Sequence, residues 1–116
     1  MIKHIFIGTI ELPPKPEFTS ILDRSYNQIS FSLKKYPEDG LEYNTTIQVA
    51  YLDGQKALDD IVLRNSGYYG RIGKGGTLQN GTTYVITVVA SSIVGQSEPL
   101  VMNFTIPRMG KFISPS

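Results

Sequence analysis

The stretch Leu78–Pro99, LQNGTTYVITVVASSIVGQSEP, carries the clearest structural pattern in the chain. From Tyr84 to Ala90, apolar side chains recur at every second position, and β-branched residues fill the positions between them. A period of two places alternate side chains on opposite faces of an extended chain, and β-branched residues suit a pleated surface. The stretch therefore predicts a long β-strand with one buried face, followed by a loop that ends near Pro99.

The same alternation recurs on both sides of this stretch. Turn signals separate the segments: Asp53-Gly54 is typical of a two-residue type I′ hairpin turn, and Asp39-Gly40 and Asn80-Gly81 lie in other connections. No window sustains the apolar spacing of a helix, and we interpret residues 55–65 as strand and turn. Short strands with frequent turns indicate an all-β antiparallel sandwich or barrel. The residues expected on the inner faces of the other strands are Ile29, Phe31 and Leu33; Ile47, Val49 and Tyr51; and Leu100, Met102, Phe104 and Ile106.

Length and composition limit the classes of protein to consider. The 116 residues suffice for one domain, and 41% hydrophobic and 18% charged residues favour a folded core over disorder. The net charge is +1 and the charges are scattered, so nucleic acid is not an expected partner. The longest apolar stretch, residues 85–94, is about half the length of a membrane span, so direct membrane insertion is not expected either.

The chain is poor in two residue types that many catalytic and metal sites use, cysteine and histidine. It has no cysteine and one histidine, His4, which excludes disulfides, thiolate chemistry and two-histidine metal sites. The glycine-rich stretch from Tyr68 to Val85 does not fit a phosphate-binding loop, because Gly73-Lys74 is followed by Gly75 and then by a strand. We interpret these glycines as turn residues, for which a positive φ costs little. We expect no enzyme activity, no bound metal and no cofactor.

The C-terminal half resembles the end of a fibronectin type III domain. That family carries Leu-x-Pro-Gly-Thr-x-Tyr, an alternating strand that ends in Ala, and a loop with Gly-x-Ser-x-Pro. The resemblance implies an immunoglobulin-like antiparallel β-sandwich of about seven strands. It also implies a structural tyrosine corner made by Leu78 and Tyr84. In this corner the Tyr84 ring is buried, and its hydroxyl is hydrogen-bonded to the backbone a few residues upstream. The matching positions are Leu78, Gly81, Thr82, Tyr84, Ala90, Gly95, Ser97 and Pro99, with Asn80 in place of the usual proline.

The resemblance covers residues 13–107, which form the expected sandwich domain. Residues 1–12 are then an N-terminal lead-in or extra strand, and residues 108–116 are a C-terminal tail or linker. The chain departs from the family in one respect, because it has no tryptophan where the family places one in the core; Leu33 stands there instead. We expect Tyr36, Tyr43 or Tyr51 to fill the space.

Domains of this family resemble spacers and binding platforms, so the resemblance implies a non-catalytic protein-binding or spacer module of an extracellular receptor or adhesion protein. The expected partner is a protein or a neighbouring domain. The alternative is an accessory or structural domain of a bacterial or phage protein that contacts carbohydrate. Loops at one end, residues 36–42 and 91–96, would hold the partner. The candidate contact residues are Tyr36, Glu38, Asp39, Glu42, Tyr43, Ile93 and Gln96.

Three Asn-x-Ser/Thr sequons begin at Asn44, Asn80 and Asn103. Each is a candidate N-glycosylation site in a secreted eukaryotic chain, although threonine-rich strands also produce such triplets by chance. A glycan on Asn44 would favour the extracellular receptor. Exposed coplanar tyrosines would favour the carbohydrate-contacting alternative, because sugar faces stack on aromatic rings; the candidates are Tyr26, Tyr36, Tyr43, Tyr68 and Tyr69.

Overall fold

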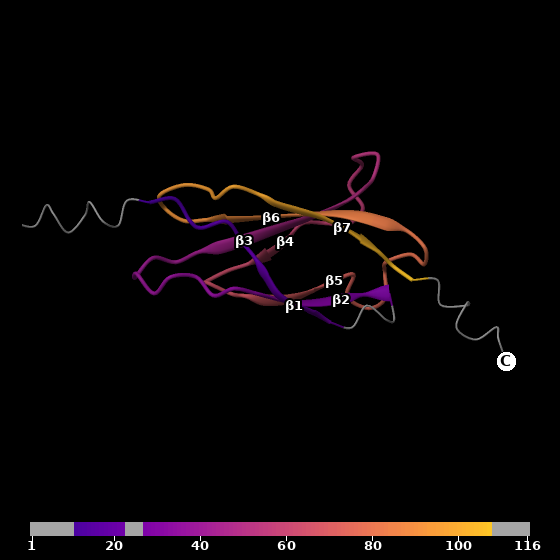
Figure 1. The fold of residues 1–116 in the computed structure, drawn as a ribbon, viewed down its shortest axis with the longest axis horizontal. Coiled ribbons are helices and arrows are strands. Elements are labelled where there is room, and N and C mark those ends of the chain that lie inside the picture. The colour runs from indigo at the N-terminus through magenta and orange to yellow at the C-terminus, as the bar shows by residue number, and fades with distance from the viewer. Residues whose placement is uncertain (1–10, 23–26, 108–116) are drawn as a thin grey trace, which may run out of the picture.

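The computed structural model describes residues 11–22 and 27–107, which form seven β-strands in two antiparallel sheets (Figure 1). No α-helix occurs within these ranges. The predicted all-β sandwich of about seven strands is therefore confirmed. The strands are β1 (Phe18–Leu22), β2 (Ile29–Leu33), β3 (Asn44–Tyr51), β4 (Ile61–Leu63), β5 (Tyr69–Ile72), β6 (Thr83–Ser91) and β7 (Leu100–Thr105).

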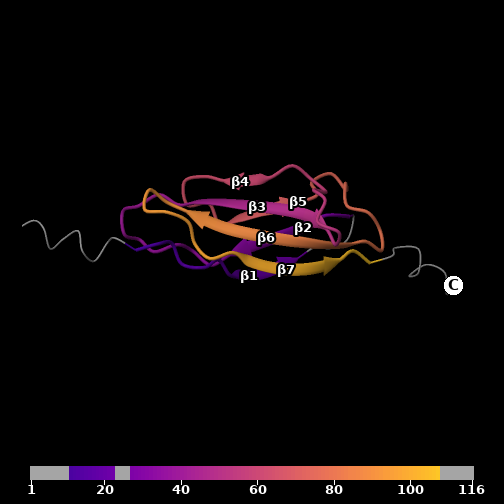
Figure 2. The ribbon, with the colours of Figure 1, turned by 90° about the horizontal axis from the view of Figure 1, so that it is seen from above.

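The smaller sheet has the strand order β1-β2-β5 and the larger one the order β4-β3-β6-β7. Figure 2 looks down onto the larger sheet, with the smaller one behind it. The longest ladder joins β3 to β6 in unbroken register, from the pair Asn44↔Ser91 to the pair Tyr51↔Tyr84. The alternation of β6 follows the prediction, since Tyr84, Ile86, Val88 and Ala90 are buried and the residues between them are half-buried.

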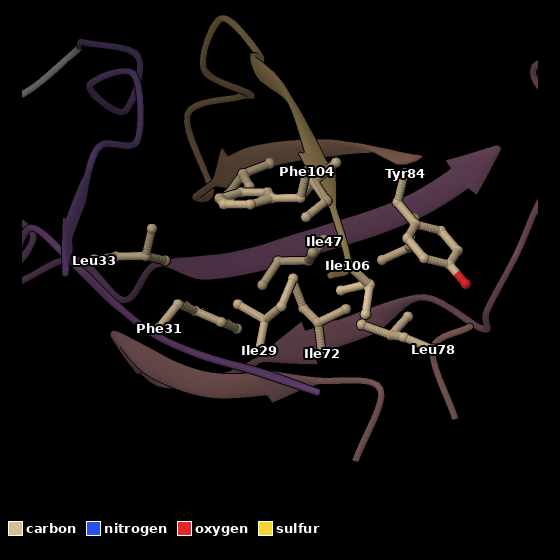
Figure 3. Packing of buried hydrophobic residues seen from close by; sticks show 12 residues of the cluster. Ile29, Phe31, Leu33, Ile47, Ile72, Leu78, Tyr84, Phe104 and Ile106 are labelled. Atoms are coloured by element: carbon tan, nitrogen blue, oxygen red, sulfur yellow. The ribbon is translucent and has the colours of Figure 1, made fainter. Parts of the chain in front are cut away.

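The core lies between the two sheets (Figure 3). Because each strand turns every second side chain inward, the residues chosen by period two meet there from both sheets. The buried residues of this cluster are Ile29, Phe31, Leu33, Ile47, Val49, Ile72, Leu78, Tyr84, Ile86, Val88, Phe104 and Ile106. Tyr51, Leu100 and Met102 are partly buried against them.

The sequence does not predict strand β5, because one of its two inward positions, beside the buried Ile72, is a glycine. Gly70 pairs with Phe31 across the ladder, and a Cβ on Gly70 would lie 3.0 Å from the Phe31 ring. The ring occupies the space that an inward side chain of β5 would otherwise fill. With a glycine at one inward position, Ile72 is the one apolar side chain that β5 turns inward, and a single residue gives no alternation to detect.

The turn after β3 is not the predicted type I′ hairpin. Both central residues of that turn need a positive φ, but of Asp53 and Gly54 only the glycine has one, at +93°. The Gly54 N–H donates to the Tyr51 carbonyl at 2.9 Å, which places Leu52 and Asp53 in the turn and Gly54 after it. The Asp53 carboxylate accepts the Gln55 N–H at 2.9 Å and so stabilises the turn from its side chain.

Candidate functional site

Tyr84 anchors the connection between the two sheets. Its side chain is 2% exposed, and its hydroxyl accepts the backbone N–H of Gln79 at 2.8 Å. Leu78 is also buried, and Figure 3 shows its side chain beside the Tyr84 ring. The Leu78 N–H donates to the Asn27 carbonyl at 3.1 Å, and the Asn27 side-chain amide donates in turn to the Leu78 carbonyl. These bonds fix the segment that leads from β5 into β6.

Two loops meet at one end of the sandwich, on the left in Figures 1 and 2. They are the β2–β3 loop, residues 34–43, and the β6–β7 loop, residues 92–99. Together they line a hollow of about 380 Å³, with Gly40, Leu41 and Glu42 on one side and Ser91, Ser92 and Ile93 on the other. The fold thus brings together two candidate contact segments that lie about 50 residues apart in sequence.

No family model matches the chain, and no curated protein matches it in sequence. Solved structures do match it. Chicken CNTN1 FN1-FN3 domains align with 81% of the chain at a TM-score of 0.60 and 23% identity, and the chain spans 32% of that structure. A structure described as FN3tt mut aligns with 84% of the chain at 0.58 and 14% identity, over its full length. A myokine structure aligns at 0.53 and 22% identity, over 84% of the chain and 98% of its own length.

The chain has the fibronectin type III fold. The expected fold class is thereby confirmed, together with the immunoglobulin-like sandwich that it implies. Residues 1–10 and 108–116 lie outside the described residues, so the expected lead-in and tail stay predictions, and so does any role of His4.

The rings of Tyr36 and Tyr43 are buried in the sandwich, which corrects their choice as contact residues. Tyr43 is 2% exposed and its ring stacks on Tyr36, with centroids 4.8 Å apart and planes 13° from parallel. Ala90 of β6 packs in the same small cluster. The Tyr36 hydroxyl is hydrogen-bonded to the buried Thr45 hydroxyl. This pair fills the loop end of the sandwich, in a cluster separate from the one that contains Leu33.

Asp39 ties the outer part of the β2–β3 loop to this buried pair. Its carboxylate accepts the Tyr43 hydroxyl at 2.6 Å and the Leu41 N–H at 3.0 Å. The bond from Tyr43 is the main reason that the pKa of Asp39 lies below its usual value. Burial, followed by the neighbouring Asp39 carboxylate, raises the pKa of Tyr43 to about 12. Asp39 is itself exposed, but its carboxylate is engaged in these contacts within the loop. Glu38 and Glu42 are the other exposed acids of the loop.

We expect the stability of the domain to fall at alkaline pH. Because the folded-state pKa of Tyr43 lies above the usual value of 10, its stabilising effect is complete below pH 10 and is lost as the pH rises through about 12. Burial also raises the pKa of Tyr36. The measurement is the thermal midpoint between pH 9 and 12. Tyr43→Phe should give a shallower decline than the wild type, and Tyr69→Phe, at an exposed ring, should not; identical declines would contradict this account.

The β6–β7 loop holds Ile93 at the tip of a tight turn. Ser92 and Gly95 exchange backbone hydrogen bonds of 2.9 and 3.2 Å, and the Ser92 hydroxyl accepts the Val94 N–H at 3.1 Å. Ile93 lies inside this turn and is 89% exposed. Leu12, also exposed, lies across the turn, because its Cδ2 is 2.7 Å from where a Cβ of Gly95 would be. Leu12 precedes the first strand and is not among the contact residues that the sequence predicts.

Gln96 does not line the same hollow as Ile93. It is exposed and lies beside Thr46, Gln48 and Val89, around a separate hollow of about 230 Å³ on the outer face of the larger sheet. Gln96 is also paired with Ser91 by a single β-bridge. Of the candidate contact residues, Glu42 and Ile93 are therefore the two that meet around one hollow.

The described tyrosines do not form an exposed coplanar set. Tyr68 and Tyr69 are perpendicular, with planes 87° apart and centroids separated by 5.5 Å, and the Lys35 ammonium lies 5.0 Å from the centre of the Tyr68 ring. Tyr69 alone is well exposed, at 68%. Since Tyr36 and Tyr43 are buried, the four described rings do not supply the exposed coplanar surface that would favour the carbohydrate-contacting alternative. Tyr26 lies outside the described residues.

The three sequons differ in surroundings. Asn44 is half-buried at the start of β3, and its side-chain oxygen accepts the Asn65 N–H at 3.2 Å. Asn80 is exposed and its side-chain oxygen accepts the Asn27 amide at 2.7 Å. Asn103 is exposed on the edge strand β7. Glycosylation of these residues stays a prediction.

The described residues contain no helix that is long and apolar enough to span a membrane. Over the same ranges, no three side chains of histidine, cysteine, aspartate or glutamate are gathered as a metal site would require.

Proposed function

We propose that this domain is a non-catalytic protein-binding module of an extracellular protein, and that the partner docks on the end where the β2–β3 and β6–β7 loops meet. The observation that carries the proposal is Ile93, a large apolar side chain 89% exposed on a turn held by its own hydrogen bonds. A residue of this kind costs little entropy to bury, because the backbone is already ordered before the partner arrives.

The surroundings of Ile93 fit a protein partner with an apolar pocket and a basic rim. The adjacent hollow of about 380 Å³ has Leu41 and Glu42 on its other side. Leu12 adds apolar surface next to the turn, and the exposed Glu38 adds a second acid on the β2–β3 loop. A central apolar anchor surrounded by polar residues is the usual arrangement of a protein–protein contact.

Hydrogen bonds and a stacked pair of rings hold the residues beneath the two loops in place. The Ser97 hydroxyl, which is buried, accepts the Ala90 N–H at 3.0 Å and donates to the Glu98 carbonyl at 2.9 Å. The Ser97 N–H donates to the Ala90 carbonyl at 2.8 Å. On the other loop, the stacked Tyr36 and Tyr43 rings hold the chain from beneath. A rigid base supports a binding role, since less conformational freedom is lost on association.

A non-catalytic role is supported by the chemistry of the residues around the hollow. Those that the structure describes offer one carboxylate, Glu42, and no histidine or cysteine. General acid–base or nucleophilic catalysis needs groups held together with shifted pKa values, and Glu42 stands without a second titratable residue on the lining.

Binding to an array of purified secreted and cell-surface domains tests the proposal. For any partner found, Ile93→Ala is expected to weaken binding by about fivefold to thirtyfold, as for an apolar anchor. The matched control is Leu52→Ala, which truncates a residue that is 66% exposed in the β3–β4 connection. This control should change affinity by less than about twofold. No binder on the array, or equal effects of the two variants, would count against the proposal.

A further inference from the structure

A second hollow lies on the outer face of the smaller sheet, away from the loop end. Its volume is about 510 Å³, and its polar lining is Ser20, Ser30, Ser32, Tyr69, Arg71 and Lys74. These residues come from all three strands, except Lys74, which follows β5. The hollow therefore crosses the face of the sheet instead of following one edge.

The register of the strands explains why the face is hollowed. Ser32 of β2 pairs with Ser20 of β1 on one side and with Tyr69 of β5 on the other. In the next outward row, Ser30 pairs with Arg71. The serines are short and make a low floor, while the long side chains of β5 form a wall. Tyr69 stands at one end of that wall and Arg71 and Lys74 at the other.

The described residues that line the hollow carry a net positive charge, from Arg71 and Lys74. The sequences of β1, β2 and β5 contain no acidic residue, and Arg71 is their one charged side chain. Among the described residues, no carboxylate lines the hollow. The ion pair found in the same part of the chain, Lys56–Asp60, belongs to the β3–β4 connection. Two cations gathered without an anion, in a chain of net charge +1, favour an anionic occupant.

We propose that this hollow binds an acidic carbohydrate, a sugar chain that bears sulfate or carboxylate groups. The serine hydroxyls both donate and accept hydrogen bonds, which suits sugar hydroxyls. The exposed Tyr69 ring offers a face for a sugar ring to stack on. Arg71 provides a planar fork for a sulfate or carboxylate, and Lys74 provides a second positive charge. An extended acidic peptide fits less well, because it would seek the backbone groups of a strand edge, and the floor here presents side chains.

The probe for a first test is a sulfated uronate hexasaccharide, titrated into the whole domain by calorimetry. Arg71→Gln/Lys74→Gln is expected to weaken binding by about tenfold or more, because each lost contact is a hydrogen bond to a charged group. The matched control, Lys15→Gln/Lys56→Gln, removes the same charge from exposed positions that do not line the hollow. Its affinity should stay within about threefold of the wild type. No binding by the wild type, or equal losses in both double variants, would overturn the proposal.

Two further ligands separate a sugar site from a merely cationic one. Tyr69→Ala should weaken binding of the hexasaccharide, and the loss should persist at high salt, since stacking is not screened as charge pairs are. Polyglutamate of equal charge should bind the wild type at least about tenfold more weakly than the hexasaccharide, because it cannot stack on Tyr69. Equal affinity for the two polyanions, with no effect of Tyr69→Ala, would assign the hollow to acidic peptides and overturn the carbohydrate proposal. Thermal melting of each variant reports whether the fold is retained.

Discussion

Replacing Tyr84 with alanine is expected to lower the free energy of unfolding by about 3–5 kcal/mol, as measured by urea denaturation. The Tyr84 side chain is almost fully enclosed, and the half-buried Tyr51 ring packs beside it with the centroids 5.7 Å apart. Removing the ring leaves a cavity where both sheets and the β5–β6 connection meet. The surrounding strands are held in continuous ladders, so they cannot collapse to refill it.

The variant Tyr84→Phe separates the contribution of the hydroxyl from that of the ring. It removes the acceptor of the Gln79 N–H and leaves the packing in place. Because Gln79 is exposed, water can reach the freed N–H, and the expected cost is about 1 kcal/mol. An unchanged denaturation midpoint for Tyr84→Phe would mean that the hydroxyl plays no part in fixing the corner.

The second large effect is expected for Gly73→Ala, which should destabilise the domain by about 2–4 kcal/mol. Gly73 has a φ of +74°, where a side chain strains the backbone. A Cβ on Gly73 would also lie 2.5 Å from Leu78 Cγ and 3.1 Å from the Asn27 carbonyl oxygen. The substitution would therefore displace Leu78 or Asn27, whose hydrogen bond holds the connection that leads into β6.

Gly75→Ala is the matched control for Gly73→Ala. Gly75 has a similar φ, +85°, but a Cβ there would meet no atom within 4 Å. It should cost about 1 kcal/mol, which is the backbone contribution alone. Guanidinium denaturation of both variants gives the difference. Equal losses would show that contact with Leu78 adds nothing to the strain at Gly73.

The sequence predicted the faces of the strands because period two is a local property. Ile29, Ile47, Ile86 and Phe104 each sit at an apolar position flanked by less buried residues, and each is in the core. The loop tyrosines could not be placed in this way. Tyr36 follows Lys34 and Lys35, which break the alternation of β2, so no period tells whether its ring is inside or outside.

The candidate sites were harder to predict than the core because they depend on pairing between distant strands. That the β2–β3 loop lies beside Ile93 follows from the pairing of β3 with β6. The serine-lined hollow depends on Ser32 lying between Ser20 and Tyr69, which is a matter of register. In a sequence, single serines at alternate positions of a strand look like ordinary surface residues. Only the pairing of the strands shows that they line one hollow together with Tyr69 and Arg71.

The first and last described strands belong to different sheets, and the described chain enters at one end of the sandwich and leaves at the other (Figure 1). A tensile force between these ends acts along the strands and loads their backbone hydrogen bonds in shear. The ladder of β7 with β6 is continuous, whereas that of β1 with β2 is interrupted between Phe18 and Ser20. The weaker link under such a load is therefore β1, and the four-stranded sheet is the part that resists extension.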